Sequence, residues 1–318
     1  MAPWTPAQMQ PLLGRTAVVT GANSGLGFET ALELAQHGAT VVMACRNQER
    51  CRDAEGWLRE SVEMARVEQA TIDLANLDSV RAFAEDFSAR HETLDILVNN
   101  AGVMAPPQRL ATAQGFELQF GTNHLGHFAL TGLLLPSLLR TAGARIVTVS
   151  SIAHESGHID FDDLQCERSY MPYAAYGQSK LANLMFMLEL DRRLRRAGAG
   201  PISVGAHPGF SSTNLQARGP FLGVPKLSSW FILAAVRLIG QSLRRGAEPQ
   251  LFAATAPGVQ GGDYYGPKNR IRGHPAASGM APQARDEASA SRLWDVSKRL
   301  TGVDIDRIIA ENLDAGRG

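Results

Sequence analysis

The chain has 318 residues, of which 44% are apolar and 19% are charged. This composition is typical of a globular protein with a large core, and it excludes the disordered and fibrous classes. The 31 basic and 31 acidic side chains cancel. Without a basic excess to neutralise phosphates, we expect no dedicated nucleic-acid binder.

The three cysteines, Cys45, Cys51 and Cys166, are irregularly spaced and odd in number. They predict neither a disulfide framework nor a zinc site, and free thiols fit a reducing compartment. The first fifteen residues lack the charged start and the long apolar stretch of a signal peptide. No apolar run reaches the about 18 residues that span a bilayer. We therefore predict a cytoplasmic protein without a transmembrane segment.

Short apolar runs alternate along the chain with longer segments of helical periodicity. The runs that predict strands are residues 16–20, 40–45, 67–72, 94–98, 145–149 and 202–206. The segments that predict helices are residues 27–37, 48–64, 77–91, 116–139 and 174–196. Strands that are apolar throughout are buried on both faces, as in a parallel sheet covered by helices. The alternation predicts an α/β fold with a doubly wound parallel sheet.

The pattern changes after residue 209. Residues 210–241 are rich in Gly, Pro and large apolar side chains, and we predict a lid that covers a lipophilic substrate. A helix over 241–255, a short strand over 261–266 and one helix near 287–300 complete the expected elements. The apolar lid residues are Phe221, Leu222, Trp230, Phe231, Ile232 and Leu233. We expect a single domain over 10–270, which includes the lid, and a C-terminal extension over 271–318.

The first predicted strand leads into a glycine-rich turn, Thr-Gly-Ala-Asn-Ser-Gly-Leu-Gly, at residues 20–27. Glycine permits the positive φ and the close backbone approach of a tight strand-to-helix turn. The free N–H groups of such a turn and the N-terminus of the next helix form a site for a pyrophosphate. A purely structural turn is the alternative. The position at the first strand–helix junction favours a dinucleotide.

The end of the second predicted strand indicates which dinucleotide binds. A site for NAD usually has an acidic residue there, which bonds the ribose hydroxyls. This chain has Cys45 followed by Arg46, and a guanidinium can pair with a 2′-phosphate through two parallel bonds. A solvated arginine is the alternative. The pattern favours NADP(H) over NAD(H).

Tyr176 and Lys180 form a candidate acid/base pair. The chain has only four lysines, and one of them follows a tyrosine by four residues on a predicted helix, where the two side chains share a face. To lower the pKa of a tyrosine from about 10 to about 7 requires about 4 kcal/mol of stabilisation of the phenolate. Attraction between unit charges about 4 Å apart is of that order at an effective dielectric near 20. We therefore expect Lys180, helped by an oxidised nicotinamide, to make Tyr176 a usable general acid/base; a core tyrosine beside a surface lysine is the alternative.

Over roughly residues 14–267 the sequence resembles the short-chain dehydrogenase/reductase family, whose fold is the Rossmann fold. The matching motifs are the glycine-rich turn, Asp73-Leu74, Asn99-Asn100-Ala101-Gly102, Asn123, Ser150-Ser151, Tyr176 with Lys180, and Pro208-Gly209 with Thr213. The loop at 154–165 and the segments at 44–46, 179–183 and 261–267 resemble the retinol-dehydrogenase-like and WW-domain-oxidoreductase-like branch.

The resemblance implies a role for each matching residue. Tyr176 would exchange the proton, Ser151 rather than Ser150 would hold the substrate oxygen, Lys180 would bind the nicotinamide ribose, and Asn123 would anchor a water-linked proton relay. Asn99 would tie adjacent strands together. The implied cofactor contacts are Gly21, Asn23, Ser24, Gly25 and Leu26 at the phosphates, Arg46 at the 2′-phosphate, Asp73 and Leu74 at the adenine, Asn100, Ala101 and Gly102 near the ribose, and Tyr176, Lys180, Pro208, Gly209 and Thr213 at the nicotinamide.

The expected activity is an NADP(H)-dependent interconversion of a carbonyl and an alcohol on a lipophilic small molecule. Two alternatives stay open: a non-catalytic NADP(H)-binding regulator on the same fold, and a double-bond reductase similar to protochlorophyllide reductase. The resemblance also implies a possible homo-oligomer that pairs through the helices at 116–139 and 174–196.

Other polar features are predicted to be structural. His154 and His158 lie near acidic residues, and we predict a solvated loop with no metal site. His124, His127 and His207 are expected to pack internally. The arginine-rich run at 192–196 is predicted to be a solvated helix face.

Overall fold

A computed structural model describes residues 3–210 and 241–315. Its centre is an eight-stranded sheet in the order β3-β2-β1-β4-β5-β6-β7-β8. The first seven strands pair in parallel and the last pairs antiparallel to β7. The strands are β1 (Thr16–Thr20), β2 (Thr40–Cys45), β3 (Arg66–Thr71), β4 (Ile96–Asn99), β5 (Arg145–Val149), β6 (Ile202–Ala206), β7 (Tyr264–Pro267) and β8 (Pro275–Ala277). The predicted doubly wound parallel sheet is confirmed.

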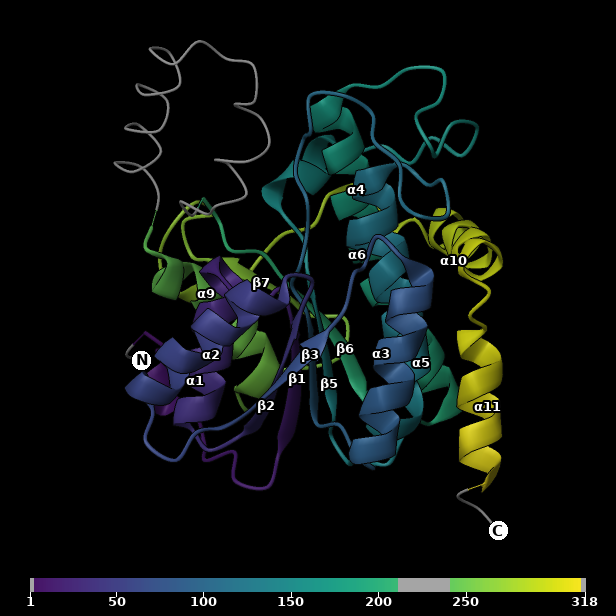
Figure 1. Ribbon diagram of the computed structural model, residues 1–318. Coiled ribbons are helices and arrows are strands. Elements are labelled where there is room, and N and C mark those ends of the chain that lie inside the picture. Colours follow the sequence, from purple (N-terminus) through teal and green to yellow (C-terminus); the bar gives the residue numbers. More distant parts are fainter. Residues whose placement is uncertain (1–2, 211–240, 316–318) are drawn as a thin grey trace.

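Helices cover both faces of the sheet (Figure 1). One face carries α1 (Gly25–Gln36), α2 (Gln48–Ser61) and α9 (Leu243–Thr255), and the other carries α3 (Leu77–Arg90), α5 (Gly126–Leu139) and α6 (Pro172–Ala197). Within the described ranges, no helix has both the length and the apolarity that crossing a bilayer demands.

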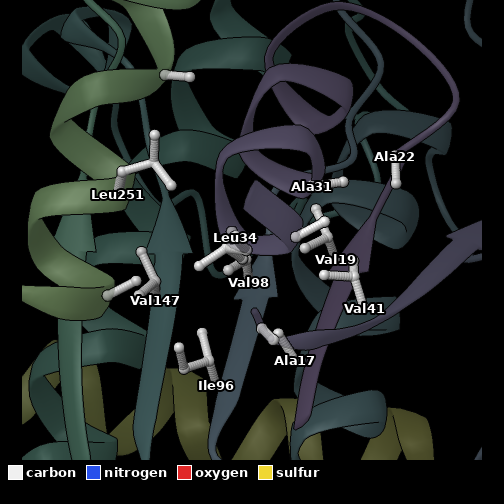
Figure 2. Packing of buried hydrophobic residues seen from close by; sticks show 14 of the residues in the cluster. Ala17, Val19, Ala22, Ala31, Leu34, Val41, Ile96, Val98, Val147 and Leu251 are labelled. Carbon is white, nitrogen blue, oxygen red and sulfur yellow. The ribbon is translucent and has the colours of Figure 1, made fainter. Parts of the chain in front are cut away.

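The two hydrophobic cores explain why the strands are apolar throughout. In β1, Ala17 and Val19 join the core under α1 and α9, while Val18 joins the core under α3 and α5. All three side chains are fully buried, and each valine so buried stabilises the fold by about 1.5–3 kcal/mol. Figure 2 shows the first core, where Leu34 of α1 and Leu251 of α9 lie over the strands.

The helix predicted over residues 116–139 is present from Leu118 to Leu139, but it contains a π-turn. It begins as a short turn, α4 (Leu118–Phe120), continues as a π-helix over Gly121–Leu125, and becomes α5 only at Gly126. In the π-turn the amide of Gly126 bonds the carbonyl of Gly121, one residue further back than in an α-helix. Because π-turns often occur at functional sites, the position of Asn123 inside this one is significant.

The C-terminal residues contain more structure than the sequence indicated. The predicted helix near 287–300 is α10 (Glu287–Thr301), but the strand β8 and the helix α11 (Ile305–Ala315) were not predicted. In Figure 1 these helices, drawn in yellow, lie at the outer side of the molecule, where α10 packs on α6 and α11 packs on α5. The resemblance implied pairing through α5 and α6, which the C-terminal helices of the same chain contact.

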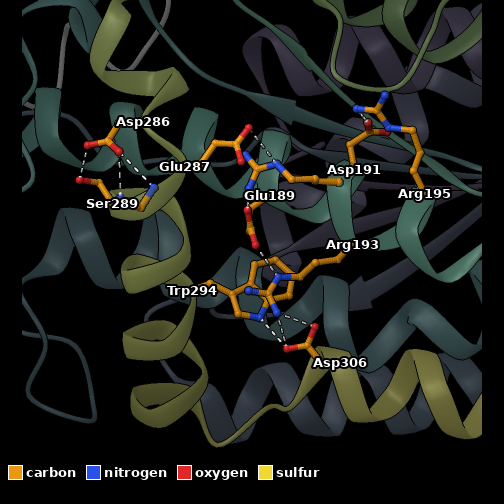
Figure 3. Close-up of polar contacts among 11 residues, drawn as sticks. Glu189, Asp191, Arg193, Arg195, Asp286, Glu287, Ser289, Trp294 and Asp306 are labelled. Carbon is orange, nitrogen blue, oxygen red and sulfur yellow. Dashed lines mark hydrogen bonds and ion pairs between the residues drawn. The ribbon is translucent and has the colours of Figure 1, made fainter.

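Arg193 corrects the prediction of a solvated face at residues 192–196. Its side chain is only 17% exposed, because its guanidinium donates to Glu189 and to both carboxylate oxygens of Asp306 at 2.7 Å. It also lies 4.5 Å over the ring of Trp294, whose indole N–H donates to Asp306 at 3.0 Å. Figure 3 shows this cluster, which fastens α10 and α11 to α6.

Candidate active site

The residues singled out from the sequence gather at one edge of the sheet. Parallel strands bring their carboxyl ends to the same edge, and in this type of fold ligands bind there. The glycine-rich turn follows β1, the Asn100–Gly102 segment follows β4, Ser151 follows β5, and Pro208 follows β6. The sheet order places β1, β4, β5 and β6 side by side.

The glycine-rich turn forms an open cradle at the N-terminus of α1. Gly21 and Gly25 have φ of +68° and +59°, which disfavours any other residue. A Cβ on Gly25 would find no atom within 4 Å, and Ser24 at the N-cap makes no capping bond with its side chain. The turn therefore offers free space beside the positive end of a helix dipole, which suits a phosphate group.

Thr20 holds this turn against the end of β4. Its hydroxyl oxygen accepts bonds from the amides of Asn100 and Ala101, each at 2.9 Å, and its carbonyl accepts a bond from the Asn100 side chain at 2.8 Å. Asn99 instead donates to Thr131 of α5 at 2.9 Å, so it ties a strand to a helix and not to an adjacent strand. Thr20 was not selected from the sequence, although it directly precedes Gly21.

Arg46 is exposed at the end of β2 and, among the described residues, has no ion-pair or hydrogen-bond partner. No carboxylate occupies the strand end where an NAD-selective site usually has one. These two observations fit a 2′-phosphate better than a pair of ribose hydroxyls. Asp73 accepts a bond from Ala75 of its own loop at 3.0 Å, and the neighbouring Leu74 is buried.

Tyr176 and Lys180 lie one turn apart in α6, and both are buried. The Lys180 ammonium nitrogen lies 5.7 Å from the centre of the Tyr176 ring and donates to the carbonyl oxygen of Val149 at 3.1 Å. The side chain of Ser151 lies close enough to the Tyr176 hydroxyl to lower its pKa. The helix therefore brings the predicted pair to one face, beside the serine that follows β5.

Burial shifts the pKa of both members of this pair. It raises the pKa of Tyr176 to about 12, and the side chain of Ser151 opposes this effect only in part. Burial also lowers the pKa of Lys180 to about 8. Both shifts follow because a buried site penalises the charged form, so the protein's own groups favour a neutral phenol. The lowering expected from Lys180 together with an oxidised nicotinamide stays a prediction.

Asn123 joins the π-helix to this cluster. Its side-chain oxygen accepts a bond from the amide of Val103 at 2.8 Å, and its side-chain nitrogen donates to Val103 and to Ser179, each at 2.9 Å. A Cβ on Gly102 would lie 3.1 Å from the Asn123 side-chain oxygen and 3.6 Å from the Lys180 nitrogen. Gly102 therefore allows Asn123 and Lys180 to approach each other.

Of the two neighbouring serines, Ser151 is the one whose side chain acts on the pKa of Tyr176. The hydroxyl of Ser150 donates to the backbone oxygen of Lys180 at 2.8 Å and is almost fully buried. These contacts support the choice of Ser151 for contact with a substrate, while Ser150 fastens β5 to α6.

The segment after β6 is shaped by close packing. Gly209 has φ of +65°, and a Cβ there would lie 2.7 Å from Pro267. His207 is buried between Ser278 and the amide of Gly209, at 3.1 and 3.2 Å, which confirms its structural role. Thr213 and the predicted apolar lid residues lie outside the described residues.

Comparison with known proteins was decisive for the family. A family profile for the short chain dehydrogenases matches residues 15–219. Retinol dehydrogenase 13 of Homo sapiens is 43% identical over 296 residues, which cover 92% of this chain and 86% of that protein. The chain belongs to the short chain dehydrogenase family. It is an oxidoreductase of the retinol-dehydrogenase-like branch, as the motifs indicated.

Two further similarities agree with the assignment of this chain to the short chain dehydrogenase family. Retinol dehydrogenase 12 of Homo sapiens is 42% identical over 295 residues, which cover 92% of this chain and 88% of that protein. A crystal structure of a protein from Mycobacterium paratuberculosis superposes with a TM-score of 0.80 at 41% identity, and covers 96% of this chain and 99% of its own. A solved relative therefore shares this fold over nearly all of the chain.

The loop after Ser151 is less exposed to solvent than the sequence predicted. His154 is buried, bonds the carbonyl of Ser151 at 2.6 Å and accepts from the amide of Ala281 at 3.2 Å, whereas His158 is exposed. The expectation of a solvated loop is therefore wrong for His154, because the C-terminal segment covers it. Across the described ranges, no three His, Cys, Asp or Glu side chains come together as metal ligands would.

A groove between described residues lies away from this site. It has a volume of about 760 Å³ and separates the 161–167 loop from α10. Charges of both signs line it, including Asp163, Asp295 and Arg292. None of the predicted catalytic or cofactor-binding residues lines this groove.

Proposed function

We propose that this short chain dehydrogenase interconverts a carbonyl and an alcohol on a lipophilic small molecule with NADP(H) as cofactor. The observation that carries the proposal is the cluster of the buried Tyr176 and Lys180 with the half-buried Ser151, at the same edge of the sheet as the cradle at the N-terminus of α1. Relatives named retinol dehydrogenase, at about 40% identity over most of the chain, support a lipophilic substrate.

The cradle would hold the cofactor's phosphates through Gly21, Asn23, Ser24, Gly25 and Leu26. The guanidinium of Arg46 would pair with the 2′-phosphate of NADP(H), since it has no competing partner among the described residues. When bound, the nicotinamide would supply or accept the hydride. The remaining assignments are Asp73 and Leu74 at the adenine, Asn100, Ala101 and Gly102 at the ribose, and Pro208, Gly209 and Thr213 at the nicotinamide.

The proton chemistry falls to Tyr176. At neutral pH its phenol is protonated, which is the form required to donate a proton to the oxygen of a carbonyl during reduction. Ser151 would hold that oxygen with its hydroxyl. Lys180 would stabilise the phenolate that remains and bind the nicotinamide ribose, and Asn123 would anchor the water through which the proton is replaced.

Two other functions on the same fold are the alternatives. A regulator that only binds NADP(H) has no need for a buried tyrosine that lies beside both a serine and a lysine. A double-bond reductase similar to protochlorophyllide reductase could use the same tyrosine, and a substrate panel that includes conjugated double bonds distinguishes it.

The test follows NADPH consumption with a panel of aliphatic, aromatic and polyene aldehydes. We expect turnover that Tyr176→Phe reduces by about a thousandfold, in the range of lost general acid catalysis, while NADPH binding measured by fluorescence remains. The matched control is Ser150→Ala, which removes a buried hydroxyl from the same region. Full turnover in Tyr176→Phe would refute the acid/base role.

The choice of cofactor has its own test. Fluorescence titration of wild type and Arg46→Ala with NADPH and NADH compares the two affinities directly. We expect tighter NADPH binding, and a loss of about tenfold or more in Arg46→Ala that NADH binding does not show. Equal losses for both cofactors would remove the role given to Arg46.

A further inference from the structure

A buried histidine connects the two halves of the proposed site. The ring nitrogen Nδ1 of His127 lies 2.9 Å from the carbonyl oxygen of Asn123, and Nε2 lies 3.0 Å from the hydroxyl oxygen of Thr20. The same hydroxyl oxygen accepts the amides of Asn100 and Ala101. A continuous line of hydrogen bonds therefore runs from the end of β4, through the threonine before Gly21, to the π-helix.

The chemistry of the groups fixes the direction of every bond. The carbonyl oxygen of Asn123 can only accept, so Nδ1 of His127 must carry the hydrogen. A neutral ring then has a bare Nε2, which accepts the hydrogen of the Thr20 hydroxyl. The carbonyl of Val98, 3.3 Å from that hydroxyl, is the more distant acceptor.

The surroundings of His127 keep its ring neutral. The side chain is 1% exposed, and burial lowers its pKa to about 4, with a smaller contribution from the charge of Lys180. The hydrogen bond to the carbonyl of Asn123 acts in the opposite direction but does not prevail. At pH 7 the ring therefore has one donor and one acceptor, and both are used.

We propose that His127 is a positioning residue for the proposed reaction. Its ring holds the carbonyl oxygen of Asn123 in a fixed position relative to the cofactor-binding turn. This inference rests on the proposed function. The side chain of Asn123 is bonded to Val103 and Ser179, and its carbonyl oxygen accepts the hydrogen of the His127 ring. His127 therefore ties the backbone of Asn123 to Thr20, which directly precedes Gly21.

His124 shows that burial of a histidine in this helix does not by itself create such a link. It is also buried in the π-helix, but its Nε2 bonds Ser297 of α10 at 2.8 Å. It has aromatic contacts with Phe120, Phe128 and Phe186. His124 therefore belongs to the packing of the C-terminal helix and serves as the matched control.

The first experiment needs no turnover. Long-range ¹H–¹⁵N correlation spectra of the full chain with labelled histidine report the tautomer of each ring, and the spectrum of His127→Asn assigns the signal of His127. We expect a neutral ring with the hydrogen on Nδ1. A hydrogen on Nε2, or a charged ring at pH 7, would overturn the inference, whatever the fate of the proposed function.

The second experiment is kinetic. In His127→Leu we expect kcat to fall about tenfold or more while the KM for NADPH stays within about threefold, as befits one lost positioning bond. His127→Asn keeps an amide N–H near the place of Nδ1 and should recover most of the loss. Thr20→Val combined with His127→Leu should cost less than the product of the single effects.

The control distinguishes positioning from packing. His124→Leu removes an equally buried ring three residues away and should lower stability while kcat stays within about twofold. If His127→Leu retained wild-type kcat, or if His124→Leu lost as much, the positioning role would be refuted. A wild-type chain that reduces no carbonyl would instead refute the proposed function, and the tautomer would still test the bond to Asn123.

Discussion

The substitution Gly27→Ala tests the packing of the glycine-rich turn. Gly27 is buried in the first turn of α1, and a methyl group there would lie 2.6 Å from the side-chain nitrogen of Asn100 and 2.8 Å from the carbonyl carbon of Gly21. The backbone of Gly21 cannot move away without opening the turn. The Asn100 amide cannot move without losing its 2.8 Å bond to the carbonyl of Thr20.

The expected cost follows from three contributions. Overpacking costs about 1–3 kcal/mol, and the weakened hydrogen bond adds about 1 kcal/mol. The better helix propensity of alanine stabilises the helix by about 1 kcal/mol. The steric cost prevails, so we expect Gly27→Ala to lower the free energy of unfolding by about 1–3 kcal/mol. For a chain of this size the melting midpoint falls by roughly 2–5 °C.

The assay is urea unfolding, with Gly56→Ala as the matched control. Gly56 lies inside α2, where a Cβ would meet no atom within 4 Å. The same substitution there should stabilise the protein by about 0.5–1 kcal/mol, because only helix propensity changes. A Gly27→Ala variant as stable as wild type, or a destabilised Gly56→Ala, would refute the reasoning.

Three further predictions concern buried polar groups. The pKa of His127 is lowered to about 4 in the folded chain. Below about pH 6.5, its approximate pKa in the unfolded chain, the unfolded state binds more protons and stability falls. His127→Asn should therefore reduce the loss in unfolding free energy between pH 7 and pH 5 by about 2 kcal/mol, and equal losses for wild type and variant in urea titrations would contradict this. Asp306→Ala removes the partner of Arg193 and Trp294 and should cost about 1–3 kcal/mol in a thermal melt, whereas the exposed Asp295→Ala should stay within about 0.5 kcal/mol. Ser151→Ala should lower kcat far more than Ser150→Ala, and equal effects on kcat would contradict the different contacts of the two hydroxyls.

Local signals in the sequence were sufficient for most of the fold. Runs such as that of β1 are apolar on both faces, and burial on both sides of a parallel sheet leaves no other composition. The spacing of Tyr176 and Lys180 fixes them on one face of α6, whatever the rest of the chain does. The family motifs placed these residues in one site because the carboxyl ends of parallel strands meet at one edge.

Contacts between distant segments decided the rest. The burial of His154 depends on Ala281, more than a hundred residues further along, and that of Arg193 on Trp294 and Asp306. The high pKa of Tyr176 follows from burial, which spacing along one helix does not report. The sequence by itself determined the strands, the helices and the glycine-rich turn, because each shows in the pattern of residues close along the chain, and its family motifs supplied the predicted reactive groups. Only the tertiary structure decided how strongly water is excluded from them and that His127 meets Thr20, because both depend on segments that only folding brings together.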